Sequence, residues 1–219
     1  QRLNNMDFFD KVDVKSEPTD VPNRKNLVIG VEEKNTGRLT FGAGFSSIDS
    51  LVGFVELSQG NFDLFKPPTF TGAGQKFRIR AQLGTRRQDY QMTFIEPWFL
   101  GRKLALGVDI YHRELDFVSD VYDERRTGAE LSLSRTLGSD FLVGRVSYTI
   151  EEVEIGDVSP LVSPAIKAEE GARSASRLGA SIAYDTRNSN FFPDQGQRTE
   201  LSTSFSGGPL GGQTDNYRI

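Results

Sequence analysis

The chain has 219 residues, a formal net charge of −4, 37% hydrophobic residues and no cysteine. This length allows one or two domains, and the acidic balance without a basic stripe argues against nucleic acid as a partner. No run approaches the roughly 18 consecutive apolar residues of a membrane helix, whereas a barrel strand turns only every second side chain to lipid and keeps the mean hydropathy low.

The first 35 residues have a different pattern of apolar residues from the rest of the chain. Gln1–Phe9 carries apolar residues at helical spacing and lacks the apolar core of a signal peptide, so we expect a helix end within a piece of a longer protein. Lys11–Glu17 and Asn26–Lys34 alternate apolar and polar residues, and the prolines between them predict a turn. This pattern predicts a small α+β fragment with too little apolar surface for its own core.

From Thr36 onward the chain repeats amphipathic segments with a period of two, about nine in number. The clearest runs from Lys76 to Leu83, where Phe, Ile, Ala and Leu alternate with Lys, Arg, Arg and Gln. Charges in mid-strand, such as Arg80, Glu130 and Arg145, suit a wet lumen, and aromatic residues at strand ends suit a membrane girdle. The sequence therefore predicts an all-β fold, an antiparallel transmembrane β-barrel, rather than a soluble sandwich with its shorter strands.

The connections between these segments alternate in character. Aromatic or short turns near 62–75, 97–103, 137–140 and 187–198 fall at one end, and more polar loops near 116–126, 156–175 and 207–216 at the other. Outer-membrane barrels have this asymmetry, with short periplasmic turns and longer loops outside.

No pattern of residues indicates catalysis, a metal or a cofactor. His112 is the one histidine and stands at a strand end, and there is no cysteine for thiolate chemistry. Gly72–Lys76 lacks the spacing of a phosphate-binding loop, so no nucleotide is expected. The acidic groups at 120–124 and 151–154 lack the glycine and spacing of a calcium loop, and we interpret them as solvated loop and rim charges.

Two features invite a functional reading. The segment Gly37–Phe45 holds glycines at 37, 42 and 44; they indicate either a weak edge that can change partners or a bend in the barrel wall. The second feature is a hairpin turn in which Asp185 and Arg187, with Arg198 beyond, can form a charge-assisted pair that fixes the turn.

Five segments of the chain resemble the BamA family of outer-membrane protein assembly factors. Each is weak alone, but they occur in the family's order and spacing. Asn5–Val12 is similar to the helix-to-strand junction of the last POTRA module, and Val28–Thr36 to the final strand of that module. The others are Gly37, Arg38, Leu39, Thr40, Phe41, Gly42, Ala43, Gly44 and Phe45, similar to the first barrel strand; Glu96–Phe99, similar to an N/E-P-[YW]-F turn; and Tyr184–Arg187 with Phe192, Pro193 and Gly196, similar to the turn before the ninth strand.

The resemblance implies that residues 1–35 end the last POTRA domain and that residues 36–219 form the N-terminal half of a 16-stranded barrel. It implies an outer membrane of the Gram-negative type, with the POTRA side in the periplasm. Residues 37–45 would then pair with a substrate strand at a lateral gate, and Asp185, Arg187, Phe192, Pro193, Gly196 and Arg198 would form a structural turn.

The partners implied are unfolded outer-membrane proteins, accessory outer-membrane lipoproteins and the lipid bilayer, without nucleic acid, nucleotide or cofactor. The protein is expected not to be an enzyme. The alternative is a polypeptide-transporting barrel of the same superfamily, either a two-partner secretion channel or a TamA-like protein.

Overall fold

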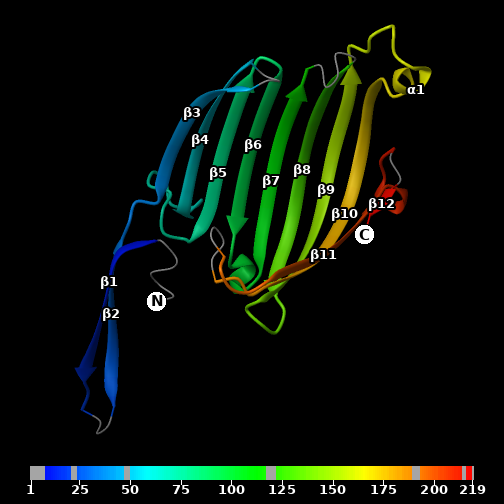
Figure 1. The fold of residues 1–219 in the computed structure, drawn as a ribbon. Helices are drawn as coiled ribbons and strands as arrows, with labels where there is room; N and C mark the ends of the chain where they lie inside the picture. The colour runs from blue at the N-terminus through cyan, green and yellow to red at the C-terminus, as the bar shows by residue number, and fades with distance from the viewer. Residues whose placement is uncertain are drawn as a thin grey trace.

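The structure is a computed structural model, and it describes residues 8–20, 24–46, 50–116, 122–188, 193–213 and 216–218. Its strands are β1 (Phe9–Pro18), β2 (Lys25–Glu33), β3 (Gly37–Ser46), β4 (Ser50–Phe62), β5 (Gln75–Gly84), β6 (Arg87–Glu96), β7 (Ala105–Leu115), β8 (Asp123–Thr136), β9 (Leu142–Gly156), β10 (Gly171–Asp185), β11 (Arg198–Ser206) and β12 (Asn216–Arg218) (Figure 1).

The helices are single turns: η2 (Phe99–Gly101), α1 (Pro164–Lys167) and η3 (Gly208–Leu210). None of the helices in the described part of the chain is long and apolar enough to cross a membrane.

Strands β1 and β2 form a separate antiparallel hairpin. Its register places Val12 opposite Val31 and Val14 opposite Ile29, so the alternating residues of both strands share one apolar face. The helix end expected over residues 1–9 lies mostly outside the described residues. Where the structure does describe it, Phe9 is not helical but begins β1.

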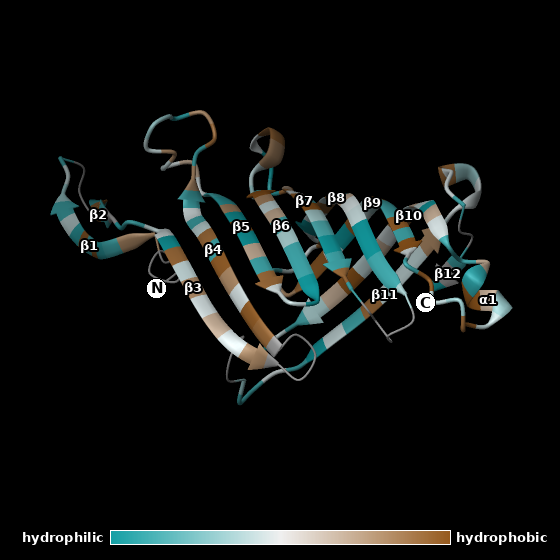
Figure 2. Cartoon of the chain, turned by 90° about the horizontal axis from the view of Figure 1, so that it is seen from above, coloured by the Kyte–Doolittle hydropathy of each residue, from teal (hydrophilic) through white to brown (hydrophobic). Residues whose placement is uncertain are grey.

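Strands β3 to β12 form one ten-stranded antiparallel sheet in which each strand pairs with its neighbours in the sequence. The sheet is curved, and β11 runs back across its hollow (Figure 2). Nine of the ten strands correspond to the nine predicted segments. The sheet is open within the described residues, with β3 at one edge and the short β12 at the other.

The register gathers the apolar residues on one face. One row across the sheet joins Leu39, Leu57, Ile79, Met92, Ile110, Ala129 and Ile150. Among the described residues no hydrophobic side chain is buried, whereas Ser132, Thr149, Glu151 and Ser206 on the opposite face are. An apolar outer face around a polar interior is the arrangement of a membrane barrel, because lipid takes the place of a core. The predicted fold class is therefore confirmed.

Three strands extend further than the sequence indicates. β8 has 14 residues and β9 and β10 have 15 each, so the loops expected at 116–126 and 156–175 are shorter than predicted. The added positions on the outer face are polar, with Glu114, Arg125 and Glu154 paired side by side. The apolar alternation ends at the membrane border while the strand pairing continues into water, which is why the sequence pattern stops early.

The connections alternate between the two ends of the sheet as predicted (Figure 1). Those after β4, β6, β8 and β10 lie at the end from which the β1–β2 hairpin projects, and those after β5, β7 and β9 lie at the other end, together with α1.

Candidate functional site at the β3 edge

The candidate site is the strand β3, which contains all nine residues predicted to pair with a substrate strand. In the described part of the chain β3 pairs with β4 and with nothing on its other side. Its apolar side chains stand far out, with Leu39 63%, Phe41 79% and Phe45 89% exposed. An unpaired strand edge offers a row of backbone N–H and C=O groups to another strand.

The glycines of β3 have separate roles. A Cβ on Gly42 would lie 2.7 Å from Cε1 of Phe54, so the glycine makes room for that ring. A Cβ on Gly37 would meet Oε1 of Gln59 at 2.7 Å, whereas Gly44 has nothing within 4 Å. Two of the three glycines therefore accommodate side chains of β4, and Gly44 alone leaves open space.

The Phe54 ring belongs to a small cluster on the inner face beside β3. The guanidinium of Arg80 lies 5.1 Å from the ring centroid of Phe54, donates a hydrogen bond of 3.1 Å to Gln82, and pairs with Glu56 at 3.6 Å. This cluster braces β4 against β5 and leaves β3 attached through β4 alone.

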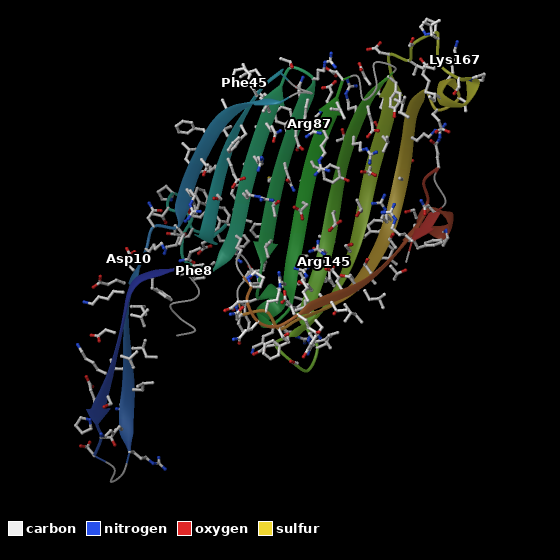
Figure 3. All side chains as sticks on the ribbon, viewed as in Figure 1. Phe8, Asp10, Phe45, Arg87, Arg145 and Lys167 are labelled. Atoms are coloured by element: carbon white, nitrogen blue, oxygen red, sulfur yellow. The ribbon has the colours of Figure 1, made fainter. Side chains whose placement is uncertain are left out.

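Two hydrogen bonds hold the segment that connects the hairpin to β3. The Lys34 N–H donates to the carbonyl of Phe8 at 2.9 Å, and the Asn61 N–H donates to Oγ1 of Thr36 at 3.0 Å. Phe8 lies at this junction and Phe45 at the far end of the strand (Figure 3). A cavity of about 530 Å³ opens here, lined by Phe8, Gly37, Arg38 and Gln59 among others.

Further from the edge, the inner face carries a polar network. The Tyr111 hydroxyl donates to Oε2 of Glu151 at 2.9 Å, and Glu151 also faces Arg177 at 3.8 Å. Arg145 and Glu130, predicted as lumen charges, pair at 2.6 Å, and Figure 3 shows Arg145 on the wall of the sheet. Glu151 was interpreted as a rim charge; it is instead 9% exposed within this network.

Sequence reasoning missed Tyr111, Glu151 and Phe54. Period-two alternation puts each of them on the inner face, but which residues meet across strands depends on the register. That register became visible only in the folded sheet.

The predicted structural turn follows β10. Arg187 donates from Nε and Nη2 to the two carboxylate oxygens of Asp185, at 2.9 and 2.7 Å, and this carboxylate raises the pKa of the Arg187 guanidinium. Arg198 pairs with Glu200 at 2.8 Å rather than with Asp185. Gly196 has φ 91°, a conformation that favours glycine. Pro193 is exposed, and Phe192 lies outside the described residues.

The far end of the sheet carries an ion-pair triad on the outer face. Arg125 bonds Glu114 at 2.7 Å and Glu154 at 2.8 Å. Asp116 lies in the connection after β7. Desolvation, and after it the negative charges of the Asp123 and Glu114 carboxylates, raise the pKa of Asp116. Among the described residues no cluster of His, Cys, Asp or Glu has the grouping of a metal site.

The comparisons with known proteins agree with this architecture. The model of the "Omp85 superfamily domain" matches residues 70–219. The chain is 26% identical over 215 residues to the outer membrane protein assembly factor BamA of Nitratidesulfovibrio vulgaris, covering 98% of this chain and 26% of that protein. It is 26% identical over 216 residues to the sorting and assembly machinery component 50 homolog of Bos taurus, covering 94% and 43%.

A solved structure has the same fold. The crystal structure of BamA from Haemophilus ducreyi lacking POTRA domains 1–3 superposes with a TM-score of 0.67 at 18% identity, covering 94% of this chain and 40% of that one. The chain thus spans less than half the length of each of these relatives. The family match extends over most of the chain and confirms the predicted outer-membrane location. The chain belongs to the Omp85 superfamily.

Proposed function

We propose that this chain is part of an outer-membrane β-barrel assembly factor, in which β3 pairs with a strand of a substrate barrel at a lateral gate. The observation that carries the proposal is the edge position of β3, whose only described neighbour is β4. A substrate strand that adds to this edge satisfies its backbone groups, and side-chain fit then selects the register. Two relatives bear names that include assembly.

The energy for this process comes from the substrate. A barrel that inserts buries its apolar strand faces in lipid and closes its own hydrogen bonds, so the mechanism uses neither nucleotide nor covalent catalysis. In this proposal the protein is not an enzyme, its partners are unfolded outer-membrane proteins and accessory outer-membrane lipoproteins, residues 1–35 end a periplasmic POTRA domain, and residues 36–219 belong to the barrel.

A second function stays open because the inner face is polar. The network around Glu130, Arg145 and Glu151 gives the barrel a wall that an extended polypeptide could pass in water. The alternative is therefore a polypeptide transporter of the same superfamily, in which the moving chain contacts the inner face rather than the β3 edge.

Disulfide crosslinking separates the two functions, since the described chain brings no cysteine of its own. One cysteine replaces Thr40 in the full-length protein, and a second is moved residue by residue along the terminal strand of a stalled barrel substrate. The matched control replaces Glu130, which lies on β8 and is flanked by paired strands on both sides. A strand cannot add beside it.

Assembly predicts a crosslink at Thr40 that peaks at one substrate register and recurs at every second position, because side chains alternate faces along a strand. Crosslinks at Glu130 and Arg80 that do not depend on register, with none along residues 38–45, would contradict the gate and favour the transporter.

A further inference from the structure

The connection between β4 and β5, residues 63–74, is folded back over the outer face of the sheet. Phe62 stacks on Phe77 with 4.9 Å between ring centroids and meets Phe94 edge-on at 6.4 Å. Phe77 and Phe94 lie opposite each other on the apolar outer face, next to the pair Ile79 and Met92. Phe70, near the end of the connection, stacks on Phe62 from the other side at 5.8 Å. The connection therefore lies against the face that contacts lipid.

Two buried amide side chains hold this connection in shape. Asn61 is 7% and Gln75 5% exposed. Oδ1 of Asn61 accepts the Gly74 N–H at 2.8 Å, and Oε1 of Gln75 accepts the Leu64 N–H at 3.0 Å. The Gln75 amide donates in turn to Oε2 of Glu96 at 2.8 Å. The loop is therefore preformed from both of its ends.

What the preformed loop presents outward is apolar. Phe65 is 85% and Leu64 49% exposed, and the neighbouring Lys66 is exposed as well. In Figure 2 the connection after β4 projects away from the hollow of the sheet, on the side opposite β11. Within the same connection, Phe70 stacks on Phe62 and Phe62 on Phe77, so a series of rings leads from the loop to the apolar outer face.

We infer that residues 63–74 are a membrane anchor, whose occupant is the interfacial layer of the leaflet on the β1–β2 side. Phe65 and Leu64 enter the boundary between acyl chains and headgroups, where aromatic rings gather. The Lys66 ammonium reaches the phosphates, as basic residues do at membrane surfaces. The buried Asn61 and Gln75 side chains hold the loop in the conformation that exposes the Phe65 ring, so the loop is already ordered before it inserts.

The anchor's position gives it a second consequence. It begins directly after β4, the one described strand that holds β3, so it fixes the level of the bilayer beside the exposed edge. This inference rests on the barrel fold and does not depend on which polypeptide the edge accepts.

Spin labelling of the full-length protein in vesicles of phosphatidylcholine and phosphatidylglycerol tests the anchor without any substrate. A nitroxide is attached to Phe65→Cys in a background without other cysteines, and its collisions with oxygen and with a water-soluble nickel chelate are compared. Leu161→Cys is the matched control, because Leu161 is 95% exposed and lies at the opposite end of the sheet.

The anchor predicts that the ratio of oxygen to nickel collisions is severalfold higher at position 65 than at position 161. It also predicts that Asn61→Ala lowers the ratio at position 65, because the loop loses the buried hydrogen bond between Oδ1 of Asn61 and the Gly74 N–H. Equal ratios at positions 65 and 161 would overturn the inference, and an unchanged ratio in Asn61→Ala would overturn the role of the preformed loop.

Discussion

At the residue scale, several glycines of the inner face make room for side chains of the adjacent strand. Gly42 leaves the space that the Phe54 ring fills. A Cβ on Gly107 would lie 2.6 Å from Oγ of Ser132, and a Cβ on Gly179 would lie 2.9 Å from Oγ of Ser147. Each of these glycines lets a side chain of the adjacent strand lie flat against the wall. The glycines of β3 thus belong partly to a pattern that runs through the sheet.

Alanine substitutions at Gly42 and Gly44 distinguish a packing role of the β3 glycines from a role in the flexibility of the strand edge. Gly42→Ala forces the Phe54 ring off its place under Arg80, and we expect a loss of about 1–3 kcal/mol in unfolding free energy, typical of overpacking. Gly44→Ala meets no atom within 4 Å and is expected to leave stability unchanged or to raise it by about 0.4–1 kcal/mol. Urea unfolding of the full-length barrel measures both.

An assembly assay on the Gly44→Ala variant adds the functional readout. If a pliable edge matters for substrate pairing, this variant assembles substrates more slowly although its stability is intact. Equal assembly rates would mean that substrate pairing does not depend on a glycine at position 44.

At the element scale, one side chain links three strands: it extends from β7 over a glycine of β8 to β9. Tyr111, Gly128 and Glu151 lie in one row across the three strands. A Cβ on Gly128 would be 2.6 Å from the Tyr111 hydroxyl oxygen and 2.9 Å from the Ile150 carbonyl oxygen. The tyrosine thus passes over the middle strand and bonds the carboxylate of the third.

Gly128→Ala is expected to break this bridge. The new methyl group cannot coexist with the ring, and the close backbone oxygen prevents it from moving away, so Tyr111 leaves Glu151. We expect a loss of about 1–3 kcal/mol in unfolding free energy, and about 1.5–3 kcal/mol for Tyr111→Phe, which removes a hydrogen bond to a charged group. Gly156→Ala, with no atom within 4 Å, is the control; equal losses in all three variants would contradict the bridge.

Elements are also the scale at which the sequence was most informative. Period-two alternation predicted nine of the ten sheet strands and their inner and outer faces, because one face must meet lipid and the other water. It could not predict the full length of β8, β9 and β10, whose ends have water on both faces. It also could not reveal the pairing of Tyr111 with Glu151, which lie 40 residues apart in the chain.

At the scale of the whole molecule, the described sheet has two edges. The strand β3 at one edge has ten residues, and β12 at the other has three. In the hydrocarbon layer each unpaired backbone group costs several kcal/mol, because no water is there to bond it. The apolar outer face favours the membrane, but the open edges oppose stable insertion of this sheet by itself.

The 219-residue chain expressed alone is therefore expected not to form a stable membrane-embedded monomer. Every second residue of the ten-residue β3 turns its backbone N–H and C=O to the side away from β4, and the cost of placing these groups in lipid exceeds what the outward side chains of one strand recover. The measurement is a shift in electrophoretic mobility on heating, combined with protease protection in vesicles, for the isolated chain and for the full-length protein as control. A heat-modifiable, protected monomer of the isolated chain would show that its edges find partners within the chain.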